Sequence, residues 1–200
     1  MVNITGSIAR AFFTITFKLA MSMCLLTGFA SAYGQGDSTR NFIGAGYFSE
    51  GGLYPGFTIF YERSLLASQN FEMVATARAG SYFHYRNQTG VFLMAQSGQR
   101  FRLYRNLYYE HYLGIGYLHT FLNGGDAYYV DATGQVHKAS NWGNAHVMPS
   151  VSFGLSYVIR SVKNPIRIFG RPVIFWQIPF NKSELVQYGL EVGVVFKYKR

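Results

Sequence analysis

Alternation of apolar with polar or small residues is the feature that most constrains the fold of this chain. Over residues 187–198 every even position is apolar, from Tyr188 to Tyr198, whereas the odd positions are Gly or polar except Val195. Successive side chains of a strand point to opposite faces, so the pattern predicts a strand between two unlike environments. Residues 147–159 show the same period, with apolar odd positions and mostly small or polar even positions.

The alternation continues, with more exceptions, through the rest of the chain beyond residue 40. Pro172 lies inside the seventh strand-like segment and has no backbone N–H to donate, so we expect a bulge or a break there. The predicted strands are residues 41–48, 57–62, 71–84, 91–104, 110–118, 147–159, 166–178 and 187–198.

These strands favour a membrane barrel over a soluble sandwich. Several of the predicted strands are longer than the usual strand of about 5 to 6 residues in soluble proteins. Aromatic residues cluster near the strand ends, where rings with one wet edge form girdles at the membrane–water interface. Backbone groups in lipid must all be paired, so the sheet has to close. The predicted girdle residues are Tyr47, Phe48, Phe83, Tyr85, Tyr108, Tyr109, Phe175, Trp176, Phe196 and Tyr198.

We therefore predict an all-β fold, an eight-stranded antiparallel transmembrane β-barrel with up-and-down meander topology. The connections at residues 67–70, 105–106 and 161–165 are expected to be short periplasmic turns, and the others longer and external. The longest, residues 123–145, is rich in Gly, Asn, Asp and Tyr and has no strand periodicity of its own.

Residues 1–34 have the pattern of a cleavable signal peptide, which leaves residues 35–200 as the barrel domain. An early positive charge, Arg10, precedes a mostly apolar stretch, and the small residues 30–32 form an A-x-A exit. Cleavage before Tyr33 and cleavage before Gln35 both fit. The only cysteine, Cys24, lies in this leader, so the mature chain would have neither disulfides nor Cys-ligated metals.

The formal charge of the chain is +9, from 18 basic and 9 acidic residues. Without Arg10 and Lys18 of the leader it is 16 minus 9, or +7. The basic residues are spread over strands and turns with no Lys/Arg-rich run, so we expect no nucleic-acid partner.

The inward face of the predicted barrel carries charges of both signs. The interior of an eight-stranded barrel is about filled by its side chains, and buried charges have to pair. We expect a closed lumen with a structural charge network, and the alternative is a narrow channel or carrier for small solutes. The predicted network consists of Glu62, Glu72, Arg78, Arg100, Arg102, Glu110, Arg167, Arg171 and Glu191.

The sequence offers little catalytic chemistry. Lipid A deacylases of the PagL type use His and Ser two residues apart with a Glu further along, and His119 has Phe121 where the Ser should be. Glu110 or Asp126 could orient His119, but no nucleophile is evident. We expect His119 to be an interfacial residue at a strand end. The five His residues show no metal-ligand spacing, so neither a metal nor a cofactor is expected.

Residues 191–198 resemble the β-signal that the outer-membrane barrel assembly machinery recognises. That pattern is a polar residue, Gly, a hydrophobic residue and a closing aromatic, here Glu191, Gly193, Phe196 and Tyr198.

Residues 113–121, 141–143 and 148–154 resemble uncharacterised outer-membrane barrels of bacteroidete-type bacteria, and in size the chain is similar to the OmpA/OmpX/OmpW group. The resemblance implies an integral outer-membrane protein of a Gram-negative cell, in contact with lipids and lipopolysaccharide. We expect a monomer. The function we expect is non-enzymatic, either structural or interactive through external loops, with a lipid A-modifying hydrolase as a further alternative.

Overall fold

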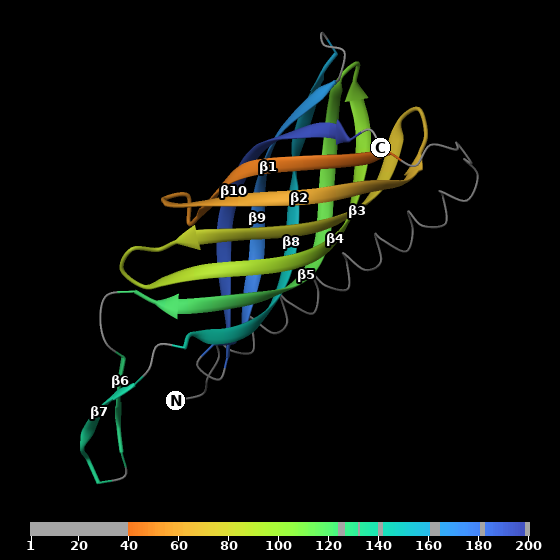
Figure 1. Cartoon of the computed structure of the whole chain (residues 1–200). Helices are drawn as coiled ribbons and strands as arrows, with labels where there is room; N and C mark the ends of the chain where they lie inside the picture. The colour runs from red at the N-terminus through yellow and green to blue at the C-terminus, as the bar shows by residue number, and fades with distance from the viewer. Residues whose placement is uncertain are drawn as a thin grey trace, which may run out of the picture. The chain divides into compact units, whose positions relative to one another are not determined.

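The computed structural model describes residues 40–123, 127–131, 133–139, 142–160, 165–180 and 183–198. The predicted signal peptide therefore lies outside the described residues. The described chain is almost entirely β-strand (Figure 1). The strands are β1 (Asn41–Glu50), β2 (Tyr54–Ala67), β3 (Phe71–Phe83), β4 (Gln88–Tyr104), β5 (Leu107–Leu122), β6 (Ala127–Val130), β7 (Val136–Ala139), β8 (Asn144–Ile159), β9 (Ile166–Phe180) and β10 (Ser183–Tyr198).

Eight of the described strands form a closed barrel in the order β1-β10-β9-β8-β5-β4-β3-β2. All neighbours are antiparallel, and the first and last strands close the sheet with Asn41 opposite Tyr198 and Glu50 opposite Gly189. We call the end where β1 begins and β10 ends the proximal end, and the opposite end the distal end. The predicted fold class is confirmed. Among the described residues no helix has the length and hydropathy to span a membrane.

The outer surface of the barrel is apolar, as the alternation predicts. In β10, Tyr188, Leu190 and Val192 are 62%, 47% and 51% exposed, whereas Gln187 and Glu191 on the other face are buried. The eight barrel strands are 10 to 17 residues long in the described chain, long enough to cross the hydrocarbon core of a bilayer at a tilt. An apolar exterior around a closed barrel is the arrangement of an integral membrane protein, because lipid replaces water outside.

The lumen is not uniformly polar, and the girdle prediction is wrong for Phe48 and Phe175. Both rings point inward and are at most 2% exposed, because they occupy the inward positions of β1 and β9. They belong to an apolar layer in the middle of the lumen. This layer consists of Phe48, Tyr82, Phe92, Met94, Leu118, Met148, Val173 and Phe175.

Several lumen rings lie directly over a glycine of the neighbouring strand. The ring of Phe60 covers Gly44, and the ring of Tyr112 covers Gly98, so closely that a Cβ at either glycine would overlap the ring. The missing side chain leaves the space that the aromatic ring fills. These pairs let large residues pack inside a narrow barrel.

No bulge forms at Pro172, but the expected break is present in one of its two ladders, because Arg171 and Pro172 pair with no residue of β8. Strand β9 runs without interruption through Pro172, which pairs with Leu190 of β10. The register between β8 and β9 is the same on both sides, with Ser152 opposite Val173 and Leu155 opposite Gly170. The proline is exposed on the outer face. Because proline has no N–H, one backbone hydrogen bond to β8 is absent, but the register of the two strands does not change.

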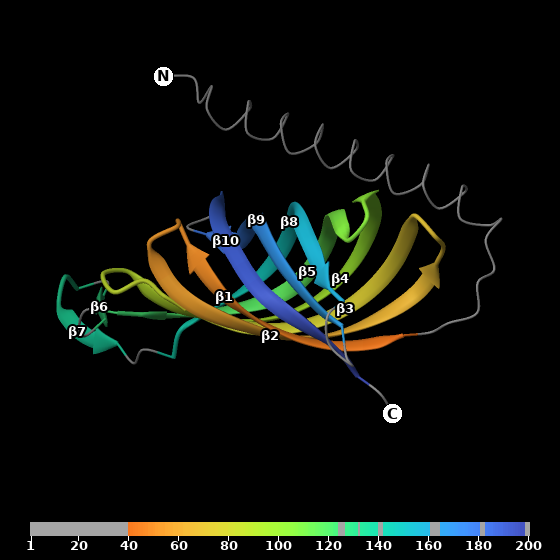
Figure 2. The ribbon, with the colours of Figure 1, turned by 90° about the horizontal axis from the view of Figure 1, so that it is seen from above.

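The connections at the distal end also differ from the prediction. Among the described residues, 51–53 and 84–87 are short links, whereas the connection between β5 and β8 is long. That connection contains a hairpin of its own, β6 paired with β7, although no periodicity signals it. Four-residue strands are too short for alternation to stand out. Figures 1 and 2 both show this hairpin beyond the barrel end opposite the C-terminus.

Candidate functional site

A network of buried charges lies in the proximal half of the lumen. The nine predicted residues all occupy inward-facing positions, because each sits on the polar side of its strand's alternation. They come from β2 (Glu62), β3 (Glu72, Arg78), β4 (Arg100, Arg102), β5 (Glu110), β9 (Arg167, Arg171) and β10 (Glu191).

Arg100 is the centre of one half of the network and is 1% exposed. Its Nη1 donates to Glu72 at 2.8 Å and its Nε donates to Glu110 at 3.1 Å. Its Nη2 contacts both Glu62 and the Tyr112 hydroxyl, the latter at 2.8 Å. Three carboxylates therefore surround one guanidinium, which leaves a net charge of −2 for two further cations to balance.

Glu191 is the centre of the other half and is fully buried. It accepts hydrogen bonds from Arg78, from Arg171 Nε at 2.8 Å and from the Thr58 hydroxyl at 2.6 Å. Arg171 Nη1 also lies 3.6 Å from a Glu110 oxygen, which joins the two halves.

Arg167 completes the network by donating to Glu62 at 2.8 Å. The connected residues are four arginines and four glutamates among the described residues, so their formal charges cancel. Several guanidiniums also lie over aromatic faces, as Arg171 does at 4.5 Å from the ring centroids of Tyr112 and Phe169. Such cation–π contacts offset part of the desolvation of buried charge.

Arg102 is the predicted network residue that the structure places apart. Its guanidinium lies 5.6 Å from the ring centroid of Tyr108. Within the described chain it forms no ion pair, and its Nε is buried without a hydrogen-bond partner. It lines a cavity at the proximal end of the barrel rather than the packed lumen, together with Tyr108, for which the girdle prediction is therefore also wrong.

The distal side of the apolar layer carries uncharged polar groups. His146 Nε2 contacts the Thr120 hydroxyl at 2.9 Å and the Gln177 amide at 3.0 Å. Beyond them a distal cavity of about 670 Å³ opens beside Glu50 and His84, whose side chains lie 3.2 Å apart. From distal to proximal, the lumen is therefore polar, apolar and then charged.

His119 lies on the outer face of β5, away from the lumen. Its Nδ1 is 2.7 Å from the Tyr117 hydroxyl and its Nε2 is 2.9 Å from the Trp142 carbonyl oxygen. Glu110 is buried inside the barrel and cannot orient this ring, and Asp126 lies outside the described residues. In the described part of the chain no group of three or more His, Cys, Asp or Glu side chains could hold a metal ion.

The turn of the distal hairpin is held by one carboxylate. Asp131 accepts hydrogen bonds from the Thr133 hydroxyl at 2.6 Å, from the Gln135 amide at 2.9 Å and from His137 Nε2, assigned here as the donor, at 2.8 Å. The Thr133 hydroxyl and then His137 hold the pKa of Asp131 below its usual value, since each favours the ionised form.

The four residues of the predicted assembly signal lie at the proximal end of β10. Glu191 points into the lumen, whereas Phe196 and Tyr198 face outward and are 47% and 48% exposed. Gly193 faces inward, where a Cβ would overlap the Ala45 carbonyl oxygen of β1. Their role in assembly stays a prediction.

Comparison with known proteins supports the fold and leaves the activity open. No protein-family model matches the chain, and no curated protein matches it. Neisserial surface protein A is 12% identical over 80% of this chain and 97% of its own, with a TM-score of 0.51.

Two further solved barrels have TM-scores below 0.5. Ail of Yersinia pestis is 11% identical over 80% of this chain and 97% of its own, with a TM-score of 0.44. The outer membrane enzyme PagL is 10% identical over 76% of this chain and 97% of its own, with a TM-score of 0.45. The eight-stranded barrel and its apolar exterior confirm the predicted location, integral in the outer membrane. The chain has the eight-stranded barrel fold that Neisserial surface protein A also has.

Proposed function

We propose that this protein is a small non-enzymatic outer-membrane barrel with a closed lumen, structural or interacting through its distal loops. The observation that carries the proposal is the stacking of two sealed layers inside the barrel. Four arginines and four glutamates form one connected, neutral network among the described residues, and a layer of apolar side chains covers it distally. A pore needs a continuous wet path, and both layers are packed with buried side chains.

The sequence motifs support a proposal for how the barrel is oriented and assembled in the membrane. We infer that the proximal end faces the periplasm and that the barrel assembly machinery recognises residues 191–198. We also propose that the protein is a monomer among lipids and lipopolysaccharide, and that it belongs with the bacteroidete-type barrels its motifs resemble.

Single-channel recording of purified, refolded protein in a planar bilayer tests the closed lumen. We expect no steady conductance above the bare bilayer, with a general porin in the same bilayer as the positive control. A double variant, Phe48→Ala with Phe175→Ala, opens the apolar layer only and should stay closed because the charge network remains. Steady wild-type conductance on the scale of a general porin would refute the proposal in favour of a solute channel.

The enzymatic alternative has its own readout. The side chains around His119 supply no Ser nucleophile at the position that the PagL-type pattern requires. Lipid A from cells that overproduce the wild-type barrel should have the same mass spectrum as lipid A from cells that carry the His119→Ala variant. Loss of an acyl chain in the wild-type sample alone would show an enzyme centred on this residue.

A further inference from the structure

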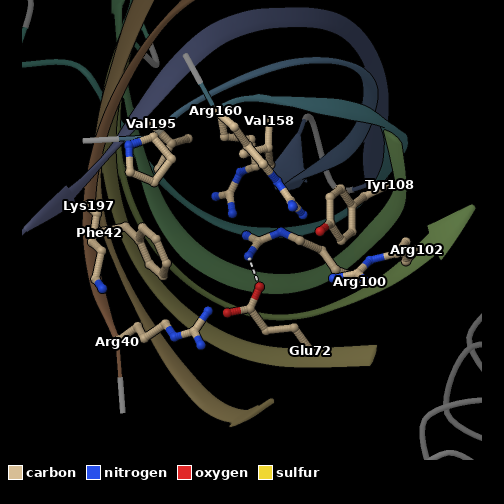
Figure 3. Close-up of a pocket in the computed structure, with 12 residues that line it drawn as sticks. Arg40, Phe42, Glu72, Arg100, Arg102, Tyr108, Val158, Arg160, Val195 and Lys197 are labelled. Atoms are coloured by element: carbon tan, nitrogen blue, oxygen red, sulfur yellow. Dashed lines mark hydrogen bonds and ion pairs between the residues drawn. The ribbon is translucent and has the colours of Figure 1, made fainter. Parts of the chain in front are cut away.

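A cavity of about 380 Å³ opens at the proximal end of the barrel (Figure 3). Its walls come from the start of β1, the ends of β4, β8 and β10, and the starts of β3, β5 and β9. Phe42 and Val195 supply apolar surface, and the outer members of the charge network form part of the wall. The volume is within the range of small-molecule sites, roughly 300–1,000 Å³.

The described lining of this cavity is strongly basic, with six cationic side chains and one carboxylate, Glu72. Two of the cations, Arg100 and Arg167, are neutralised by glutamates of the lumen network. The other four form no ion pair with any described residue, so the cavity carries four uncompensated positive charges. These four residues are Arg40, Arg102, Arg160 and Lys197.

A second observation indicates that an acceptor belongs here. Arg167 is only 8% exposed, and although its Nη2 donates to Glu62, its Nε is buried without a partner. Arg102 Nε is also buried and unpaired within the described chain. Buried polar groups are nearly always hydrogen-bonded, so the Nε atoms of Arg102 and Arg167 have hydrogen-bonding capacity that the described residues leave unused. In Figure 3, Arg40 and Arg160 reach towards the hollow from opposite walls.

We propose that the proximal cavity binds a compact phosphate-bearing anion with two or more negative charges. Guanidinium groups match the oxygens of phosphate with paired N–H donors, and several cations around one cavity favour a multiply charged ligand over a single carboxylate. Two sources share this chemistry, a soluble phosphate ester and the headgroup of a phospholipid from the leaflet around this end of the barrel. The binding site needs no open lumen, so it stands independently of the closed-barrel proposal.

Titration calorimetry with inorganic pyrophosphate tests the site, using refolded barrel in detergent at low ionic strength. The test variant combines Arg40→Gln with Arg160→Gln, two exposed residues outside the lumen network. The control, Arg86→Gln with Lys138→Gln, also removes two positive charges, but from the distal side of the barrel. We expect saturable 1:1 binding that is at least about tenfold weaker in the test variant, as charge-assisted contacts are lost. The control should bind like wild type, and heat-modifiable gel mobility verifies that each barrel is folded.

Native mass spectrometry of barrels released from nanodiscs distinguishes the two sources. A lipid headgroup is supported if wild type and control retain one phosphatidylglycerol molecule and the test variant loses it. Pyrophosphate should then displace this lipid from wild type. Pyrophosphate binding with no retained lipid supports a soluble phosphate ester. No saturable binding of pyrophosphate or phosphatidylglycerol by wild type would overturn the proposal. Equal weakening in the test and control variants would overturn it too, because only net charge would then matter.

Discussion

Replacing Glu62 with glutamine removes one charge from the lumen network and leaves its shape almost unchanged. Glu62 is 1% exposed and accepts hydrogen bonds from Arg100 and, at 2.8 Å, from Arg167. Arg100 keeps Glu72 and Glu110 as partners. The loss therefore falls on Arg167, which forms no other ion pair among the described residues.

The magnitude follows from the burial of this pair. Removing one partner of a buried ion pair costs about 3–5 kcal/mol, because the remaining charge stays buried and unpaired. The side chain of Arg167 is 9% exposed at the edge of the proximal cavity. Partial access to water places Glu62→Gln at the lower end, about 3 kcal/mol less stable than wild type. Glu184→Gln, near the distal rim, is the matched control and should change stability by less than about 0.5 kcal/mol.

A double variant tests whether charge balance is the cause. Glu62→Gln with Arg167→Met restores neutrality, with three arginines and three glutamates left in the network. We expect a coupling free energy of about 2 kcal/mol, so the double variant should be more stable than Glu62→Gln alone. Urea unfolding of barrels in lipid vesicles, monitored by the fluorescence of the two tryptophans, measures the stabilities of wild type, Glu62→Gln, Arg167→Met and the double variant. Additive losses in the double variant would refute a mutually neutralised network.

Two other predictions concern assembly and the distal hairpin. Changing Phe196 and Tyr198 to Asp places charge on the lipid face, at up to about 2–4 kcal/mol each near the midplane and less at the interface. The amount of folded barrel in the outer membrane, measured by heat-modifiable gel mobility, should fall sharply. Replacing residues 199–200 with serine should have little effect. The reverse result would contradict our placement of the terminal strand. The Thr133 hydroxyl and other donors lower the pKa of Asp131 in the folded protein. The ionised carboxylate should therefore stabilise the turn fully above the ordinary aspartate pKa of about 4, and this stabilisation should be lost as the pH falls below that value. Amide hydrogen exchange of the turn measures this, and an Asp131→Asn variant with the same pH profile would show that the carboxylate is not responsible.

The number of barrel strands and the two faces of each could be predicted from the sequence, because period-two alternation depends only on local geometry. The pairing of Arg100 with three glutamates from three strands could not, since it depends on the register of β2, β3 and β5 against β4. The apolar layer was missed because inward rings such as Phe92 look like exceptions to the alternation. The proximal cavity brings together Arg40, just before β1, and Lys197 of β10, the last barrel strand, and no local pattern marks that convergence.

The glycines beneath the lumen rings determine which sequence changes this barrel can accept. At Gly44 an alanine would collide with Phe60, and replacing the ring alone would leave a void beside the bare glycine backbone. Either change is costly by itself, whereas an alanine paired with a smaller partner keeps the volume. The glycine and the ring that covers it should therefore be substituted together in related sequences. Correlated substitution between residues 44 and 60, or 98 and 112, would therefore reveal strand register in relatives too divergent to align by identity.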